Sequence, residues 1–249
     1  MLDGTHALVT GGGTGIGAAI ARALADQGAM VTITGRRAAP LDAMRGPRLS
    51  PRLMDVRDET SVREATAEAV RAHGPVQICI VNAAIAEQTT LPETSLEAWR
   101  ETMSTNLDGA FLTIRESLRS MLDRDWGRVI AISSVAGLRG MKRAPPYVAS
   151  KHGLVGLIRA LAEDHLGRPH TFNALCPAYV ETEIVPRNIE RVMARDGLSR
   201  AEATALVHAA NRHGRLIAPE EIAGAVLWLC GPQSGSINGQ AIEIAGGQF

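Results

Sequence analysis

The sequence predicts an α/β fold in which helices cover both faces of a doubly wound parallel sheet. Short apolar runs alternate with longer segments of helical periodicity along the chain of 249 residues. The runs are nearly all apolar, as in Arg128–Ile132, which is typical of strands buried on both faces. Right-handed crossovers then place helices on both sides of the sheet. Chains of about 250 residues in this class often form one domain, so we expect residues 1–249 to be a single domain.

The first half of the chain alternates strands and helices. Apolar runs predict strands at His6–Thr10, Met30–Gly35, Leu53–Val56 and Gln77–Val81. The third of these is placed beyond Pro47 and Pro51. Helical periodicity predicts helices at Ile16–Gln27 and Glu59–His73, and Asp58 is a candidate N-cap for the second helix.

The second half continues the alternation. Leu96–Leu122 carries a long helical pattern, and Arg128–Ile132 is an apolar strand. A helix is predicted at Tyr147–Leu166, entered by the pair Pro145-Pro146. The last predicted elements are the strand Thr171–Cys176, a helix near Pro219–Leu229 and the strand Ala241–Ala245.

Residues 183–215 break this rhythm. The segment is helical in pattern, charged and alanine-rich, and it contains no predicted strand. An inserted helical pair next to the strand ends would suit a lid over a substrate, and a surface elaboration without function is the alternative. Its apolar side chains either line a wall of the substrate site or pack the insert against the body; they are Ile184, Val185, Ile189, Val192 and Met193.

Charge and cysteine content narrow the class of protein. Lysine plus arginine and aspartate plus glutamate both number 26, so the formal net charge is zero and nothing points to nucleic acid. Cys79, Cys176 and Cys230 are far apart and show neither the spacing of a metal site nor a disulfide framework. We expect three buried, reduced thiols and no metal.

The chain shows no membrane or export signal. No apolar run reaches about 18 residues, so no membrane span is expected. The chain enters its first predicted strand within a few residues, which leaves no room for a signal peptide. We therefore expect a soluble cytoplasmic protein.

A glycine-rich loop at residues 10–17, with the sequence TGGGTGIG, joins the first strand to the first helix. Glycines let the backbone turn tightly and approach a pyrophosphate, and the helix N-terminus offers free N–H groups and partial positive charge. The glycines Gly11, Gly15 and Gly17 are spaced differently from the commoner G-x-G-x-x-G. Such a cluster can be a plain strand–helix turn, but its place after the first strand favours dinucleotide binding.

Tyr147 and Lys151 lie four residues apart in a predicted helix, and therefore on one face of it. A free tyrosine has a pKa of about 10, and a nearby ammonium lowers that value toward neutrality. Tyr147 could then both give and take a proton. Together with the glycine loop, the pair indicates an enzyme that binds a dinucleotide and moves a proton during hydride transfer.

The chain resembles the short-chain dehydrogenase/reductase family. The resemblance rests on the loop at 10–17, on Asn82-Ala83-Ala84 after the fourth strand, on Ser134, and on the run YVASK at 147–151. It covers essentially the whole chain, and it implies a Rossmann-like fold. The closest likeness is to the family's 3-oxoacyl-thioester reductases. A homotetramer is expected by family analogy alone.

The resemblance implies a catalytic tetrad of Ser134, Tyr147, Lys151 and Asn106. Ser134 stands thirteen residues before Tyr147, as the family's catalytic serine usually does. Asn106 resembles the family's helix asparagine, which holds a water that links the lysine to solvent. Taken singly, each residue has a structural reading, such as a strand-end turn for Ser134. Their joint occurrence with the glycine loop favours the catalytic reading.

The resemblance also implies a set of cofactor contacts. Asp55 and Val56 match the pair that contacts adenine. The segment Cys176–Thr182 matches the one whose valine backbone and threonine meet the nicotinamide amide. The predicted cofactor-binding residues are Gly11, Thr14, Gly15, Ile16, Gly17, Arg36, Asp55, Val56, Asn82, Tyr147, Lys151, Pro177, Val180 and Thr182.

Three positions depart from the family pattern. Ala84 and Ala178 stand where the family has glycine, and each adds a Cβ where the backbone approaches the cofactor. The change is benign if φ is negative there, so we expect slight repositioning rather than loss of binding. Val81 replaces a polar side chain that would support the end of the fourth strand.

The implied reaction is reversible carbonyl reduction with hydride from C4 of the nicotinamide. In this scheme Tyr147 donates a proton to the carbonyl oxygen, and Ser134 donates a second hydrogen bond that stabilises the developing negative charge. Lys151 lowers the tyrosine pKa and bonds the nicotinamide ribose. Asn106 and water return the proton.

The end of the second strand bears on the choice of cofactor. Gly35 stands where NAD-type members have an aspartate for the ribose hydroxyls, and Arg36 follows it. A guanidinium pairs well with a phosphate, so we predict NADP(H). NAD(H) is the alternative, because Thr14 is not the basic residue of many NADP-type loops, and Arg36 and Arg37 can be solvated charges.

Two features bear on the substrate. The loop after the serine carries Arg139, Lys142 and Arg143, which either meet a phosphate-bearing tail such as that of coenzyme A or are solvated. Family members that dock an acidic carrier protein tend to present two arginines beside the active-site entrance. Arg168 stands at one such place, but Asp125 stands at the other and would repel a carrier.

A small-molecule ketone or secondary alcohol is the expected substrate, with a 3-oxoacyl thioester the leading candidate. One alternative is an NAD(H)-dependent secondary-alcohol dehydrogenase of a small or aromatic substrate. A different class is a non-catalytic Rossmann protein that senses nicotinamide redox state. Such a protein need not keep the tetrad, so the tetrad favours the enzyme.

Overall fold

The structure, a computed structural model, describes residues 1–183 and 185–247. Its strands are β1 (His6–Thr10), β2 (Met30–Gly35), β3 (Leu49–Leu53), β4 (Ile78–Val81), β5 (Gly127–Ile132), β6 (His170–Pro177) and β7 (Ala241–Ile244). They form one sheet in the order β3-β2-β1-β4-β5-β6-β7, and every neighbouring pair is parallel. The prediction of a parallel, Rossmann-like sheet is confirmed.

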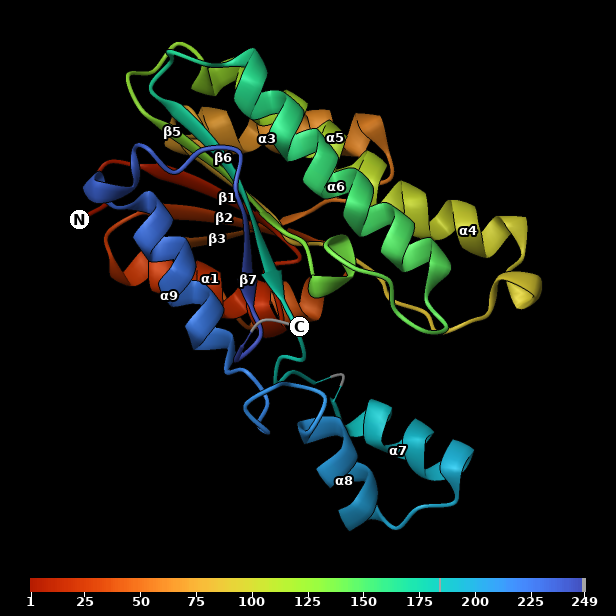
Figure 1. Cartoon of the computed structure of the whole chain (residues 1–249). Helices are drawn as coiled ribbons and strands as arrows, with labels where there is room; N and C mark the ends of the chain where they lie inside the picture. The colour runs from red at the N-terminus through yellow and green to blue at the C-terminus, as the bar shows by residue number, and fades with distance from the viewer. Residues whose placement is uncertain (184, 248–249) are drawn as a thin grey trace.

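Helices cover both faces of this sheet. They are α1 (Gly15–Asp26), α2 (Ala38–Asp42), α3 (Glu59–His73), α4 (Leu96–Met103), α5 (Gly109–Met121), α6 (Pro145–Asp164), α7 (Val185–Asp196), α8 (Arg200–His208) and α9 (Pro219–Cys230). Shorter turns are the 3₁₀ segments η1 (Leu91–Glu93), η3 (Val135–Gly137) and η4 (Pro232–Ser234) and the π turn η2 (Ser104–Asp108). Figure 1 shows α3, α5 and α6 over one face and α1 and α9 over the other. The predicted doubly wound arrangement is therefore present.

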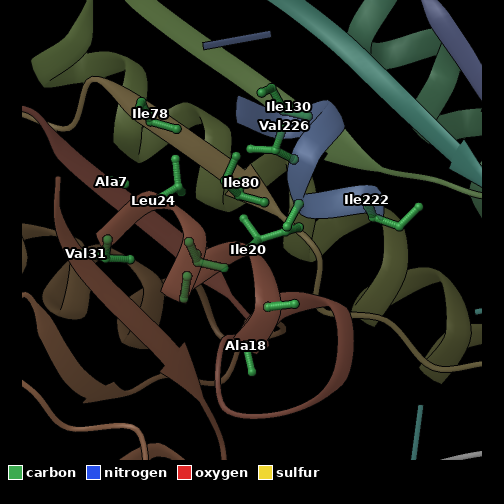
Figure 2. Close-up of a cluster of buried hydrophobic side chains, with 14 of the residues drawn as sticks. Ala7, Ala18, Ile20, Leu24, Val31, Ile78, Ile80, Ile130, Ile222 and Val226 are labelled. Atoms are coloured by element: carbon green, nitrogen blue, oxygen red, sulfur yellow. The ribbon is translucent and has the colours of Figure 1, made fainter. Parts of the chain in front are cut away.

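The α1/α9 face holds a continuous apolar core. Ile20 of α1 and Ile222 and Val226 of α9 are fully buried, and Figure 2 shows them pointing toward strand residues such as Ile80. Each such side chain contributes about 1.5–3 kcal/mol by leaving water. A second core around Phe172 fills the opposite face, under α5 and α6.

The third strand lies earlier than predicted, at Leu49–Leu53 instead of Leu53–Val56. The Met54 N–H donates to the Gly35 carbonyl of β2. The backbone N–H groups of successive strand residues point to opposite edges of the strand. Since the Met54 N–H points toward β2, position 51 points to the outer edge of the sheet. A proline at that position removes no bond from the ladder, so the strand runs through it.

The long helical pattern at 96–122 is interrupted. The π turn at Ser104–Asp108 separates α4 from α5, and Asn106 lies within it. A π turn holds one extra residue per turn and is frequent at functional sites. The sequence pattern shows no sign of this turn. By contrast, Asp58 accepts from the Thr60 N–H at 2.9 Å and caps α3, as predicted.

The insert at 183–215 folds as the helical pair α7–α8. Figure 1 shows this pair beyond the ends of β6 and β7, separated from the body. Ile189, Val192 and Met193 pack with Val207 of α8 in a small cluster of their own. The predicted apolar side chains, Val185 included, therefore pack the insert rather than form an open wall, and Ile184 lies outside the described residues.

Neither a membrane-spanning helix nor a metal-binding cluster occurs in the described part of the chain. None of its helices is both long enough and apolar enough to cross a bilayer. It contains no group of three or more His, Cys, Asp or Glu side chains placed to hold a metal. Cys79, Cys176 and Cys230 are free and buried, as predicted.

Candidate active site

The glycine loop occupies the point where the strand order reverses, between β1 and β4. Gly11 and Gly15 have φ of +63° and +51°, a conformation that favours glycine. A Cβ on Gly17 would lie 2.3 Å from the Gly11 carbonyl oxygen, so only glycine fits there. Thr14 precedes α1, and its side chain does not cap the helix. The first N–H groups of α1 can therefore bind an anion such as a pyrophosphate.

Asn82 holds this loop in place. Its Nδ2 donates to the carbonyls of Thr10, at 2.9 Å, and Gly11, at 3.3 Å. The Asn82 N–H donates in turn to Thr10 Oγ1 at 2.9 Å. The Asn82 side chain is therefore bonded to the backbone of the glycine loop and holds that loop in position.

The other end of the loop meets the segment after β6. A pocket of about 320 Å³ lies here, and Thr14, Gly15 and Thr182 are among its lining residues. A Cβ on Gly15 would lie 3.3 Å from the Thr182 methyl carbon, so the two segments are in contact. Three of the predicted cofactor residues thus share one pocket.

Other predicted cofactor residues support this region from the core. Pro177 ends β6, and Val180 is buried and forms a bridge with Ile217. Ile16 packs against the α1/α9 core, and Val56 is buried beside α3. Their side chains therefore act on the site through packing.

The end of β2 carries a cationic group beside Asp55. Arg36 is exposed immediately after Gly35, the last residue of the strand. Asp55 is bonded by Arg57 at 2.6 Å, which holds the pKa of its carboxyl below the usual range, and Arg36 adds to that effect. Arg36 and Asp55, both predicted cofactor residues, therefore lie near one another at this edge.

Ser134 and Tyr147 are brought together at the carboxyl end of β5. Ser134 follows that strand, and its Oγ accepts from the Ala136 N–H at 3.1 Å. A Cβ on Gly137 would lie 2.6 Å from Ser133 Oγ and 2.8 Å from the Lys151 carbonyl oxygen. The absence of a side chain on Gly137 lets this turn lie directly on α6. The Ser134 hydroxyl lies close enough to the Tyr147 phenol to lower the pKa of that phenol.

Burial sets the acidity of the central pair. It raises the pKa of Tyr147, against the hydrogen bond with Ser134, which lowers it. Burial also lowers the pKa of Lys151 to about 8. Lys151 Nζ donates to the Ile132 carbonyl at 2.9 Å and lies 5.7 Å from the centre of the Tyr147 ring. The expected lowering of the tyrosine pKa by Lys151 is therefore wrong for this arrangement, because burial raises that pKa and Lys151 is not among the groups that lower it.

Asn106 is buried in the π turn and joins two segments of the site. Its Nδ2 donates to the Ile85 carbonyl at 2.9 Å and to Ser150 Oγ at 3.0 Å, while its Oδ1 accepts from the Ile85 N–H at 2.8 Å. Ser150 Oγ donates to the Tyr147 carbonyl at 2.8 Å. These bonds connect Asn106 to the start of α6, and this helix carries both Tyr147 and Lys151.

Sequence reasoning missed two residues here. Asn211 brackets the Tyr179 backbone, accepting from its N–H at 2.9 Å and donating to its carbonyl at 2.8 Å. Tyr179 is one of only two tyrosines in the chain, and the other is Tyr147. That rarity is a signal the sequence offered for Tyr179, whereas nothing in the sequence singles out Asn211.

The two alanine departures from the family pattern are structurally benign. Among the described non-glycine residues only Arg143 has a positive φ, so Ala84 and Ala178 have the backbone conformation that an alanine accepts. Arg143 is also not a free cation, since it lies 3.4 Å from Glu93. Arg139 has a partner too. The basic loop therefore offers fewer free charges than its sequence indicates.

The residues considered for carrier docking lie far from the site. Asp125 and Arg168 precede β5 and β6, whereas Ser134 follows β5. A strand of six residues is about 20 Å long, so the two residues lie at the opposite end of the sheet from the tetrad. Their predicted place beside the active-site entrance is wrong within one chain.

Comparison with known proteins agrees with this geometry. The family model described as short chain dehydrogenase matches residues 5–192. A putative ketoacyl reductase of Streptomyces coelicolor is 34% identical, with 98% of this chain and 97% of that protein covered. A galactitol 2-dehydrogenase of Cereibacter sphaeroides is 36% identical, with 99% and 95% covered.

A solved structure extends the likeness to three dimensions. A variant of actinorhodin polyketide ketoreductase with NADPH has a TM-score of 0.95 and 33% identity, with 99% of this chain and 98% of that chain covered. The chain therefore belongs to the short-chain dehydrogenase family, and it is an oxidoreductase that interconverts an alcohol and a carbonyl compound with a nicotinamide cofactor.

Proposed function

We propose that this chain is an NADP(H)-dependent ketone reductase whose leading substrate is a 3-oxoacyl thioester. The observation that carries the proposal is the contact of Ser134 with Tyr147, next to buried Lys151 and across from the glycine loop. Ketoacyl reduction is named for the Streptomyces relative and for the solved ketoreductase. The substrate assignment rests on those names together with whole-chain similarity.

The catalytic roles follow from the positions of the side chains. When bound, a nicotinamide would supply the hydride for the carbonyl carbon. Burial keeps Tyr147 protonated near neutral pH, so its phenol is ready to donate to the carbonyl oxygen. Ser134, ordered by the Ala136 N–H, donates a second hydrogen bond to that oxygen. These two donors stabilise the negative charge that develops there.

Lys151 and Asn106 complete the proposed tetrad. Lys151 is one helical turn beyond Tyr147. Its ammonium, which donates to the Ile132 carbonyl, can therefore exchange that partner for the ribose of a bound cofactor. Asn106 holds the segment at Ile85 against α6. Because these bonds fix the Asn106 amide, they hold the start of α6 in place beside the site. In this proposal a proton returns from solvent to Tyr147 along the route that passes Lys151 and Asn106.

The assignment of NADP(H) rests on Arg36. Arg36 directly follows the end of β2. The residue before it is Gly35, so the acidic side chain that would bind the ribose hydroxyls of NAD is absent at that position. The neighbouring carboxylate, Asp55, is already paired with Arg57. Replacing Arg36 by Ala is expected to raise KM for NADPH and to leave KM for NADH little changed. Tighter use of NAD(H) by the unaltered enzyme would overturn the assignment.

A second candidate has specific support. The galactitol dehydrogenase relative is more similar by identity than the Streptomyces relative, at 36% against 34%, which favours oxidation of a small secondary alcohol. The helical pair α7–α8 serves as a lid in either case, and its place beyond β6 and β7 supports that role. A redox sensor without turnover remains the rival from another class.

One assay separates these candidates. Absorbance of the reduced cofactor is followed with acetoacetyl-CoA, aryl ketones and the matching alcohols, using both NADP(H) and NAD(H). The proposal expects turnover of acetoacetyl-CoA with NADPH. Small ketones reduced without any thioester turnover would remove the thioester, and binding without turnover of any compound would favour the sensor. Tyr147→Phe is the control, expected to lose at least about a hundredfold in kcat while still binding cofactor.

A further inference from the structure

Tyr179 lies between the proposed active site and the helical insert. It follows β6 by two residues, next to the carboxyl end of β5, from which Ser134 extends. Two residues further on, the backbone reaches Val180 and Glu181, where the Glu181 N–H donates to the Ile217 carbonyl. The tyrosine is therefore fixed where the body of the enzyme meets the α7–α8 pair.

The main chain and ring of Tyr179 are both held firmly. Asn211, which is 1% exposed, bonds the Tyr179 N–H and carbonyl with the two ends of its amide. The ring packs against the apolar cluster of α7 and α8, which includes Ile189 and Val207. A residue held in this way keeps its place between the body of the enzyme and the helical pair.

The phenol of Tyr179 is left available. It is close enough to Tyr147 to raise that residue's pKa. Its hydroxyl makes no hydrogen bond to any described residue, and the side chain is only partly buried. Tyr179 and Tyr147, the two tyrosines of the chain, therefore lie near one another, and of their hydroxyls only that of Tyr147 has a side-chain neighbour that affects its pKa by hydrogen bonding, Ser134.

We propose that Tyr179 is a specificity residue whose hydroxyl donates a hydrogen bond to a second oxygen of the substrate, two carbons from the reacting carbonyl. This inference rests on the proposed ketone reductase function. Tyr147 and Ser134 are occupied by the reacting oxygen, which leaves the Tyr179 donor for a neighbouring acceptor. A 3-oxoacyl group has its second carbonyl oxygen at that separation, on the same chain.

The test compares two substrates that differ in this oxygen alone. Ethyl acetoacetate has the second carbonyl, and 4-ethoxy-2-butanone has the same chain length without it. The ratio of their kcat/KM values is measured in the unaltered enzyme and in Tyr179→Phe. The ratio removes the intrinsic difference in reactivity between the two ketones. The Phe variant keeps the ring that packs against α7 and α8.

We expect this ratio to fall about tenfold in Tyr179→Phe, the effect of about one hydrogen bond. An unchanged ratio would overturn the inference, even if kcat/KM falls by the same factor for both substrates. The pH profile of kcat/KM distinguishes an indirect effect through Tyr147, because a shifted profile with an unchanged ratio assigns Tyr179 to tuning rather than recognition. If the unaltered enzyme reduces neither ketone, the proposed function fails instead, independently of Tyr179.

Discussion

At the scale of single residues, the site contains ionisable groups whose charged forms are destabilised by burial. Lys151 is 2% exposed, and its ammonium bonds the main-chain carbonyl of Ile132. Its pKa of about 8 reflects how unfavourable the buried charge is. Such a residue is retained for function rather than for stability.

Replacing Lys151 by Met should therefore stabilise the fold while abolishing turnover. The folded pKa of about 8 lies below the ordinary value of 10.5, so the unfolded chain binds more protons between these two pH values. Stability of the unaltered protein then rises with pH across that window and is lowest below pH 8. The variant, lacking the group, should gain up to about 3 kcal/mol at pH 7.

Thermal unfolding of both proteins at pH 7 and pH 9.5 checks this. The gain in Tm should shrink at the higher pH. A variant that is less stable than the parent at pH 7, or a gain independent of pH, would contradict the buried-ammonium account.

The candidate catalytic side chains could be predicted from the sequence, but their pKa values could not. Tyr147, Lys151 and Ser134 could be named because their spacing is local. The pKa of Tyr147 depends on how completely the fold surrounds it, which no spacing reveals. The proximity of Tyr179 was equally hidden, since it depends on where β6 ends relative to β5.

At the scale of elements, the glycine loop depends on a side chain from another strand. Asn82, after β4, bonds the carbonyls of Thr10 and Gly11 after β1. Two parallel strands that are distant in sequence thus share one connection at the point where the sheet changes direction. The anion-binding end of α1 takes its position from this connection.

Asn82→Ala should weaken cofactor binding about tenfold and destabilise the fold by about 1–2 kcal/mol. A matched control is Asn238→Ala, since Asn238 Oδ1 accepts from the Phe172 N–H at 2.8 Å far from the loop. Cofactor affinity is measured by fluorescence titration and stability by urea unfolding. Both variants should lose stability, and only Asn82→Ala should lose affinity. Equal affinity in the two variants would reject the positioning role.

Element prediction succeeded where patterns were local and failed where they were not. The cap at Asp58 and the apolar run of β5 follow from neighbouring residues alone. The strand through Pro51 was displaced because its tolerance of proline depends on lying at the edge of the sheet. The π turn around Asn106 was missed because no local pattern marks it; the Asn106 side chain bonds Ser150 of α6, which is 44 residues away in the chain.

At the scale of the whole molecule, pH should act on stability from the end of the sheet opposite the site. His6, at the start of β1, is buried with its ring bonded to the Gly74 carbonyl at 2.8 Å and to Thr32 Oγ1 at 2.9 Å. Burial lowers its pKa to about 4. His73, whose ring centre is 5.4 Å away, adds a smaller effect in the same direction.

Stability should accordingly fall as the pH drops from about 6.5 to 4. In that window the unfolded chain takes up a proton on His6 that the folded chain refuses. The expected loss is about 3 kcal/mol. In His6→Gln the free energy of unfolding should vary much less between pH 6.5 and 4.5, whatever its value at pH 7. Retention of the full slope would place the acid sensitivity elsewhere.

The course of β3 has a consequence for self-association. At its outer edge the Leu49 N–H and carbonyl are both bonded to Gly46, Pro51 has no N–H, and the Pro51 carbonyl accepts from Arg52 at 2.9 Å. Of the N–H groups that face this edge only that of Leu53, at the end of the strand, remains, so a foreign strand lacks the donor at position 51 that it would need to extend a ladder. Pro51→Val would restore the donor at position 51. We expect this variant to keep its catalytic activity and to scatter more light than the unaltered protein, because its chains would stack edge to edge.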